Sequence, residues 1–243
     1  MMFLSNISLT SVVLSQVKFK LSAYSGLIYS LIILQVLGIL FATGWSSSGT
    51  SINNISINLN ISSIDSGFIF VSLLAISVGN LITTRAYRYD DFSFVATRLS
   101  SNIANCIVLL IFSCYAGVTT YFSVYLMRIF LTFNSTNEFV EGPTILDDPM
   151  NSLLTILAMI IFLWMFSSLG YIAGTLFQKH KLLFFGALVI IIMLLLTGTW
   201  IRISEIIFVE NSSLLILIAK TFGIAILIFA TSTAISNRLG VRV

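Results

Sequence analysis

The side chains best able to do chemistry are scarce in this 243-residue chain, and their spacing does not suit catalysis. A metal site needs several His, Cys, Asp or Glu ligands, yet the single histidine, His180, stands between two lysines. Cys106 and Cys114 fall inside one apolar segment, as small buried hydrophobic residues do. Serines and threonines are plentiful, but the sequence offers them no partner base. We therefore expect no catalytic residue, no metal site and no enzyme activity.

The sequence also lacks a nucleotide-binding device. It contains no phosphate-binding loop of the P-loop type, and no glycine-rich turn follows a predicted strand. The chain is therefore expected to bind no cofactor of its own. Any ATP-driven work requires a partner that holds ATP and Mg.

One short connection, residues 85–100, mixes charged, aromatic and apolar side chains. On a helix, Tyr87, Asp91 and Arg98 fall at spacings compatible with one face, so the stretch predicts a short amphipathic helix along the membrane surface. One interpretation is a docking element, in which aromatic rings enter a partner's groove and charges fix its register. The alternative is a solvated turn whose arginines only set the topology. The docking interpretation assigns partner contacts to Arg85, Tyr87, Arg88, Asp90, Asp91, Phe92, Phe94 and Arg98.

Two further cations, Arg128 and Lys220, fall in or near the outer halves of apolar segments. A charge at the centre of a membrane helix costs about 3 kcal/mol on insertion scales unless it reaches the headgroups or pairs. Either each side chain extends to the outer headgroup region, or both line a translocation path between helices. The sequence leaves both explanations open.

The composition indicates what kind of element positions these residues. Of the chain, 58% is hydrophobic and only 9% is charged, with a mean hydropathy of +1.05, which leaves too little polar surface for a water-soluble globule. Two prolines and fourteen glycines suit helices better than a membrane barrel. We therefore predict an all-α integral membrane protein.

Six apolar segments are long enough to be membrane spans. They cover about residues 24–43, 67–84, 103–132, 151–177, 182–200 and 214–236, so residues 1–243 form one transmembrane domain. The third and fourth exceed the roughly 20 residues that a span needs, so they should tilt or continue beyond the bilayer. The first twenty residues resemble an amphipathic, interfacial lead-in to the first span.

The basic residues set the orientation, because short loops rich in Lys and Arg stay in the cytoplasm. Nine of the twelve fall on one side of the six-span arrangement. Seven of the nine acidic residues fall on the other side. Both termini are therefore predicted to be cytoplasmic.

This layout resembles the permease subunit of a type-2 ABC exporter. The pattern Arg-X-X-Arg-X-Asp-Asp-Phe-X-Phe from Arg85 is similar to the coupling helix of that family, which lies between spans two and three. The segment 201–213 matches the re-entrant element expected before the last span. The resemblance implies ABC ATPase subunits as partners, together with a second permease copy or a homologous permease.

The expected function is thus an ATP-driven permease that exports a hydrophobic or amphipathic cargo, such as a peptide, an antimicrobial agent or a lipid-like molecule. The expected location is a bacterial plasma membrane, with membrane lipids and no nucleic acid as further partners. Two alternatives remain: a non-transporting anchor or sensor subunit, and an ion-coupled carrier. The carrier is disfavoured because no Asp or Glu falls in the middle of a predicted span.

Overall fold

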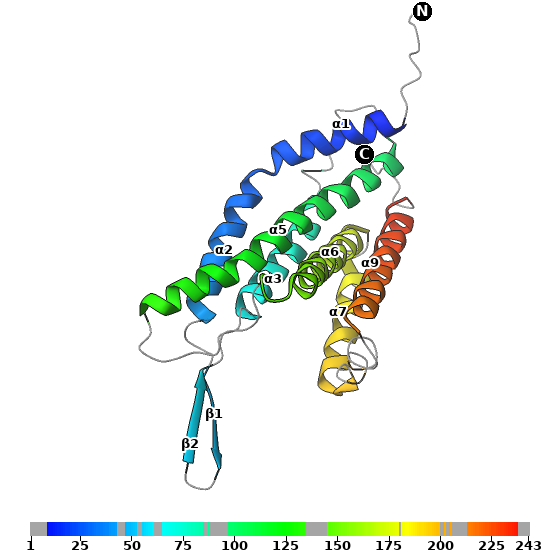
Figure 1. Cartoon of the computed structure of the whole chain (residues 1–243). Coiled ribbons are helices and arrows are strands. Elements are labelled where there is room, and N and C mark those ends of the chain that lie inside the picture. Colours follow the sequence, from blue (N-terminus) through cyan, green and yellow to red (C-terminus); the bar gives the residue numbers. More distant parts are fainter. Residues whose placement is uncertain are drawn as a thin grey trace, which may run out of the picture.

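The computed structural model describes residues 9–42, 47–52, 55–60, 65–84, 87, 97–134, 145–179, 181–199, 202, 205 and 213–237. Helices dominate these residues (Figure 1). They are α1 (Leu9–Ala23), α2 (Gly26–Ala42), α3 (Asp65–Ile82), α5 (Arg98–Asn134), α6 (Pro149–Lys179), α7 (Lys181–Leu196) and α9 (Leu214–Asn237). Each of the six predicted apolar segments overlaps one of these helices. Helix α1 covers part of the predicted lead-in, whose residues 1–8 lie outside the described residues.

Helix length and composition support a membrane-embedded protein. Three helices in the described part are long and apolar enough to cross a membrane: α5, α6 and α9. The α1–α2 pair, bent by 53°, passes the same test as one broken span, and α3 is a shorter apolar helix. The predicted length of the third and fourth segments is confirmed, because α5 has 37 residues and α6 has 31.

Glycines bring α3 and α6 into close contact. A Cβ atom added at Gly170 would lie 2.0 Å from the carbonyl oxygen of Ile76, and one at Gly79 would lie 2.1 Å from that of Ser167. Gly174 likewise faces Thr83 and Asn80. The sequence predicts close packing for the Gly170/Gly174 pair, with dimer contact as an alternative. The structure confirms the packing role, and α3 of the same chain occupies the face that these glycines form.

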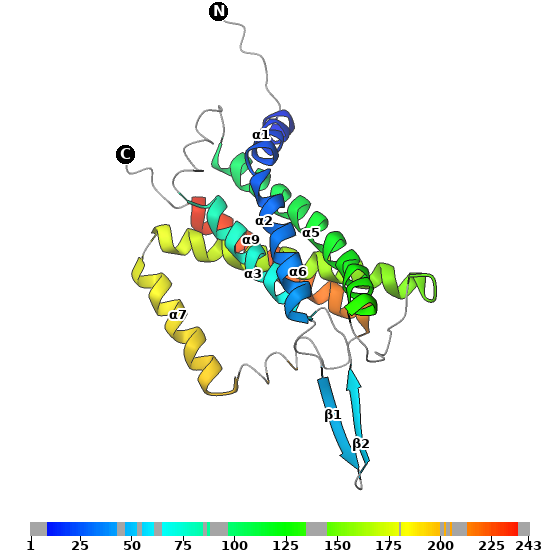
Figure 2. The same ribbon diagram turned by 90° about the vertical axis from the view of Figure 1, so that its left-hand side faces the viewer.

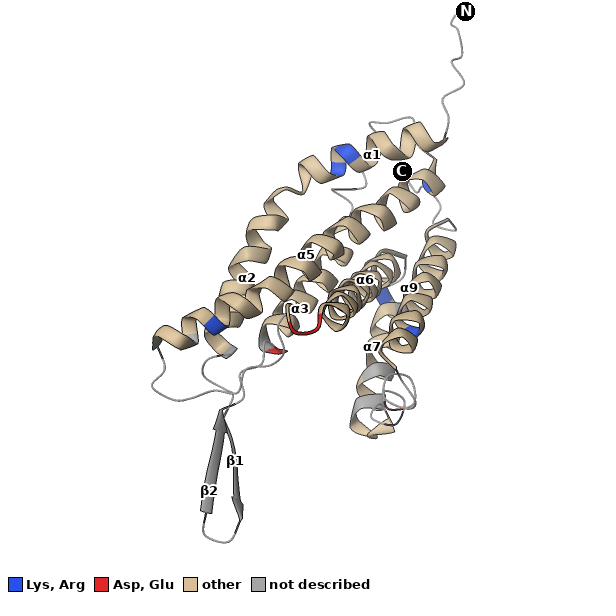
Figure 3. Ribbon diagram, viewed as in Figure 1, with Lys and Arg blue, Asp and Glu red and all other residues tan. Residues whose placement is uncertain are grey.

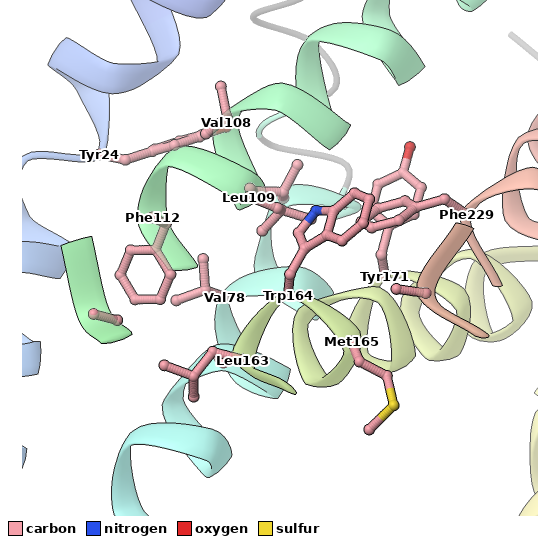
Figure 4. Packing of buried hydrophobic residues seen from close by; sticks show 14 of the residues in the cluster. Tyr24, Val78, Val108, Leu109, Phe112, Leu163, Trp164, Met165, Tyr171 and Phe229 are labelled. Carbon is pink, nitrogen blue, oxygen red and sulfur yellow. The ribbon is translucent and has the colours of Figure 1, made fainter. Parts of the chain in front are cut away.

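Aromatic rings fill the centre of the bundle. The Trp164 ring from α6 lies 5.3 Å from the Phe229 ring of α9, and Tyr171 lies 5.8 Å from the same phenylalanine (Figure 4). Leu109 from α5 and Val78 from α3 are buried in the same cluster. The core therefore joins α3, α5, α6 and α9.

The ends of the bundle differ. The first turn of α1 and the last turn of α9 lie at one end, and the two-stranded hairpin projects from the other (Figures 1 and 2). Helix α7 contacts α6 and stands apart from the other helices (Figure 2). Few charged positions interrupt the described ribbon (Figure 3).

The hairpin is an element that the sequence analysis does not predict. Strands β1 (Ser47–Ile52) and β2 (Ile55–Asn60) pair antiparallel, with Ile52 opposite Ile55. Residues 55–59 alternate aliphatic and polar types, which is the period-two pattern of a strand. The all-α prediction therefore holds for the apolar segments, while the connection between the first two carries a small sheet.

Candidate partner-docking end and its buried polar cluster

The predicted docking stretch joins α3 to α5 at the end of the bundle that holds α1. Of its residues, Tyr87 is described and half-buried, and its ring meets that of Tyr24 edge-on at 5.1 Å between centroids. Tyr24 is buried at the bend between α1 and α2. Tyr87 is therefore held against this bend. The predicted contacts that lie outside the described residues are Arg85, Arg88, Asp90, Asp91, Phe92 and Phe94.

The other end of the stretch is fixed by a helix cap. Thr97 precedes α5, and its side-chain oxygen accepts a hydrogen bond from the backbone N–H of Ser100 at 3.2 Å. The Ser100 hydroxyl donates to the Thr97 carbonyl at 2.7 Å. A threonine that bonds the third N–H of a helix is a favoured N-cap, so α5 begins at Arg98. The Arg98 side chain is exposed at this end.

A lysine of α1 is buried beneath this end. Lys20 is only 3% exposed, and its ammonium donates a hydrogen bond to the side-chain oxygen of Asn105 on α5. The backbone N–H of Tyr24 donates to the Lys20 carbonyl at 2.9 Å. One helical turn therefore carries both the ring that contacts Tyr87 and the cation that contacts α5.

The hydrogen bonds continue from Lys20 across the bundle. The Asn105 amide donates to the Tyr171 hydroxyl of α6 at 3.3 Å, and that hydroxyl donates to the Asn102 side-chain oxygen at 2.8 Å. The Ser236 hydroxyl of α9 lies 3.4 Å from the same oxygen. We call these five residues the polar cluster. It connects α1, α5, α6 and α9, and every member is buried.

A buried charged group inside a membrane bundle is a strong indication of a functional site. A buried cation is costly unless hydrogen bonds or charges compensate it, so such groups persist mainly where they serve a purpose. Here the Lys20 ammonium is compensated in part by Asn105. The described residues contain no group of three or more possible metal ligands. The hydrogen bonds of the cluster join four helices, so they hold these helices in register.

Helix α1 carries polar and apolar side chains on both of its sides. The residues that it buries are Val13, Gln16, Val17 and Lys20. On its exposed side, Leu14 and Phe19 are 67% and 41% exposed, and Lys18 is exposed beside them. In a membrane the two exposed apolar side chains contact lipid.

The two outer cations lie on different helices. The guanidinium of Arg128, on α5, lies 5.6 Å from the centroid of the Tyr125 ring on the same helix. Lys220, on α9, is half-buried, as is Arg128. Their proposed part in a translocation path remains a prediction. His180 lies outside the described residues, as does most of the segment 201–213.

The polar cluster is not predicted from the sequence. There, Lys20 is one of the nine basic residues on the predicted cytoplasmic side, and no motif marks Asn102, Asn105 or Tyr171. A usable signal was present, because Gln16 and Lys20 are spaced by four residues in a segment that is otherwise largely apolar. Polar residues at helical spacing in such segments predict a polar interhelical contact.

Comparisons of the chain with models of protein families, with curated proteins and with solved structures found no match.

Proposed function

We propose that this chain is the membrane-spanning permease subunit of an ATP-driven exporter similar to the type-2 ABC exporters. In this proposal α2, α3, α5, α6, α7 and α9 are six spans, and both termini lie in the cytoplasm of a bacterial cell. An even number of spans puts the start of α1 and the end of α9 on one side, in agreement with their positions in Figure 1.

The observation that carries the proposal is the way the docking stretch is anchored. Tyr87, near its start, contacts Tyr24 at the α1–α2 bend, and its end runs into the capped start of α5. Tyr24 is one helical turn from Lys20, which bonds to α5. A partner that moves residues 88–96 therefore acts on two helices of the bundle at once.

The partner's role follows from what this chain lacks. ABC ATPase subunits bind ATP and Mg and dock on the eight predicted contacts between Arg85 and Arg98. A second permease copy or a homologous permease completes the path, and Arg128 and Lys220 face it near the outer leaflet. The cargo is hydrophobic or amphipathic, because the helices offer an apolar wall with few polar groups.

The rival functions make different demands on the residues. An ion-coupled carrier needs carboxylates at mid-membrane. Of the described acids, Asp65 is the first residue of α3, Asp147 and Asp148 precede α6, and Glu205 is exposed between α7 and α9. A lone anchor or sensor needs no ATPase. The anchor is therefore the rival that an experiment must exclude.

Affinity purification from native membranes separates the permease from the anchor. The full-length chain should bring an ATP-binding-cassette ATPase with it. The Asp91→Ala and Phe92→Ala variants should insert normally but retain much less of this ATPase, whereas Lys181→Ala, at an exposed position outside the stretch, should retain all of it. Purification without any ATPase, or unchanged retention in both stretch variants, contradicts the proposal.

A further inference from the structure

Two buried carboxamides at the junction of α1 and α5 lack hydrogen-bond partners. Gln16 is 1% exposed, and neither its side-chain nitrogen nor its oxygen is bonded within the described part of the chain. Asn102 is 6% exposed; its oxygen accepts from Tyr171, but its nitrogen has no acceptor there. Because unsatisfied buried polar groups carry a free-energy penalty, such groups call for a bound partner.

Helix geometry brings these groups to one seam. Helices α1 and α5 run alongside each other in the same direction (Figure 1), and Lys20 bonds to Asn105. Gln16 lies one turn before Lys20, so it lies level with residues 101–102, one turn before Asn105. Gln16 and Lys20 therefore lie along the contact between α1 and α5, and Asn102 lies at the same level on α5, where its side-chain oxygen bonds to Tyr171 of α6.

We propose that this seam binds the phosphate group of a membrane phospholipid. Within the described residues, the side-chain N–H groups of Gln16 and Asn102 donate to no acceptor. A phosphate oxygen is a strong acceptor for such groups. Lys20 keeps its bond to Asn105 and adds a positive charge next to the site. Basic pockets between membrane helices are known headgroup sites.

The surroundings favour a lipid over a soluble phosphate. Leu9, Leu14 and Phe19 on α1 are all exposed and apolar, so within a membrane they contact acyl chains. Lys18, also exposed, adds a second cation on the same helix.

A binding experiment on the purified full-length chain tests the site and needs no ATPase, so it stands apart from the proposed function. Delipidated protein in maltoside micelles is titrated with phosphatidylglycerol, with diacylglycerol or with inorganic phosphate, and bound lipid is counted by native mass spectrometry. The wild-type chain should bind phosphatidylglycerol in preference to the other two. Gln16→Leu should bind it at least about tenfold more weakly, as expected when a hydrogen bond to a charged group is lost.

A matched control exists in α2. The Gln35 amide donates to the Thr119 hydroxyl at 2.8 Å and to the Thr120 hydroxyl at 3.2 Å, so Gln35→Leu removes a satisfied carboxamide and should leave lipid binding unchanged. If Gln16→Leu fails to fold, Gln16→Glu replaces it; the added negative charge repels a phosphate and should weaken binding by a similar factor. Equal binding in the Gln16 variant that folds, equal binding of diacylglycerol, or equal binding of inorganic phosphate overturns the proposal.

Discussion

The contact between α3 and α6 allows a quantitative prediction for Gly170→Ala. The new Cβ would lie 2.0 Å from the carbonyl oxygen of Ile76, whereas ordinary contact begins at 3.4 Å. The two helices must therefore separate locally by about 1.4 Å, the difference between those distances. Overpacking of this kind costs about 1–3 kcal/mol, while replacing a helical glycine with alanine contributes about 0.5–1 kcal/mol in the other direction.

Gly186 and Gly223 provide the controls. A Cβ at either position meets nothing within 4 Å among the described residues, so alanine there brings only the gain in helix propensity. We expect Gly186→Ala and Gly223→Ala to equal or exceed the wild-type stability. Gly170→Ala should fall below both controls by about 1–3 kcal/mol.

The assay is the free energy of unfolding in mixed micelles, measured by titrating a denaturing detergent while following helical circular dichroism. If Gly170→Ala proves as stable as Gly186→Ala, the close approach of α3 and α6 is refuted.

Three further predictions concern the cluster, the topology and the outer cations. Tyr171→Phe removes a hydroxyl that joins Asn102 to Asn105, so it should lower the free energy of unfolding by about 1–3 kcal/mol. Tyr115→Phe, at an exposed position, should leave that free energy unchanged, and equal stability of the two variants contradicts the cluster. In a chain whose Cys106 and Cys114 are replaced by Ala, cysteines introduced at Ser47 and Asp147 should react with an impermeant thiol reagent outside intact cells. A cysteine introduced at His180 should not react, and labelling there reverses the predicted orientation. Arg128→Met and Lys220→Met should preserve expression but lower cargo-stimulated ATP hydrolysis, and native activity in both removes them from the path.

The helices were predictable because a run of about 20 apolar residues has few alternatives in a membrane. The predicted span of residues 214–236 differs from α9 by one residue, and the predicted 151–177 lies within α6. These boundaries depend on local composition alone. The number of segments that cross the membrane and their orientation remain predictions.

The polar cluster was harder to predict because its chemistry is tertiary. The sequence places Lys20 in an interfacial lead-in, where it counts only toward the orientation; its burial becomes visible when α1 packs against α5. The same applies to Asn105 and Tyr171, which lie 66 positions apart in the chain. Spacing on one helix predicts which residues share a face, but it does not predict which distant helix that face meets.

The affinity between this chain and its ATPase tests the central claim most directly. The chain is placed in lipid nanodiscs, and its dissociation constant is measured with the ABC ATPase that co-purifies with it or is encoded beside it. Phe92→Ala should weaken this binding at least about thirtyfold, because truncating a buried interface anchor typically costs 2 kcal/mol or more, and Lys181→Ala should leave it unchanged. Absence of binding by the wild-type chain, or equal affinity of the wild type and Phe92→Ala, contradicts the assignment of residues 85–98 as the docking element of a permease.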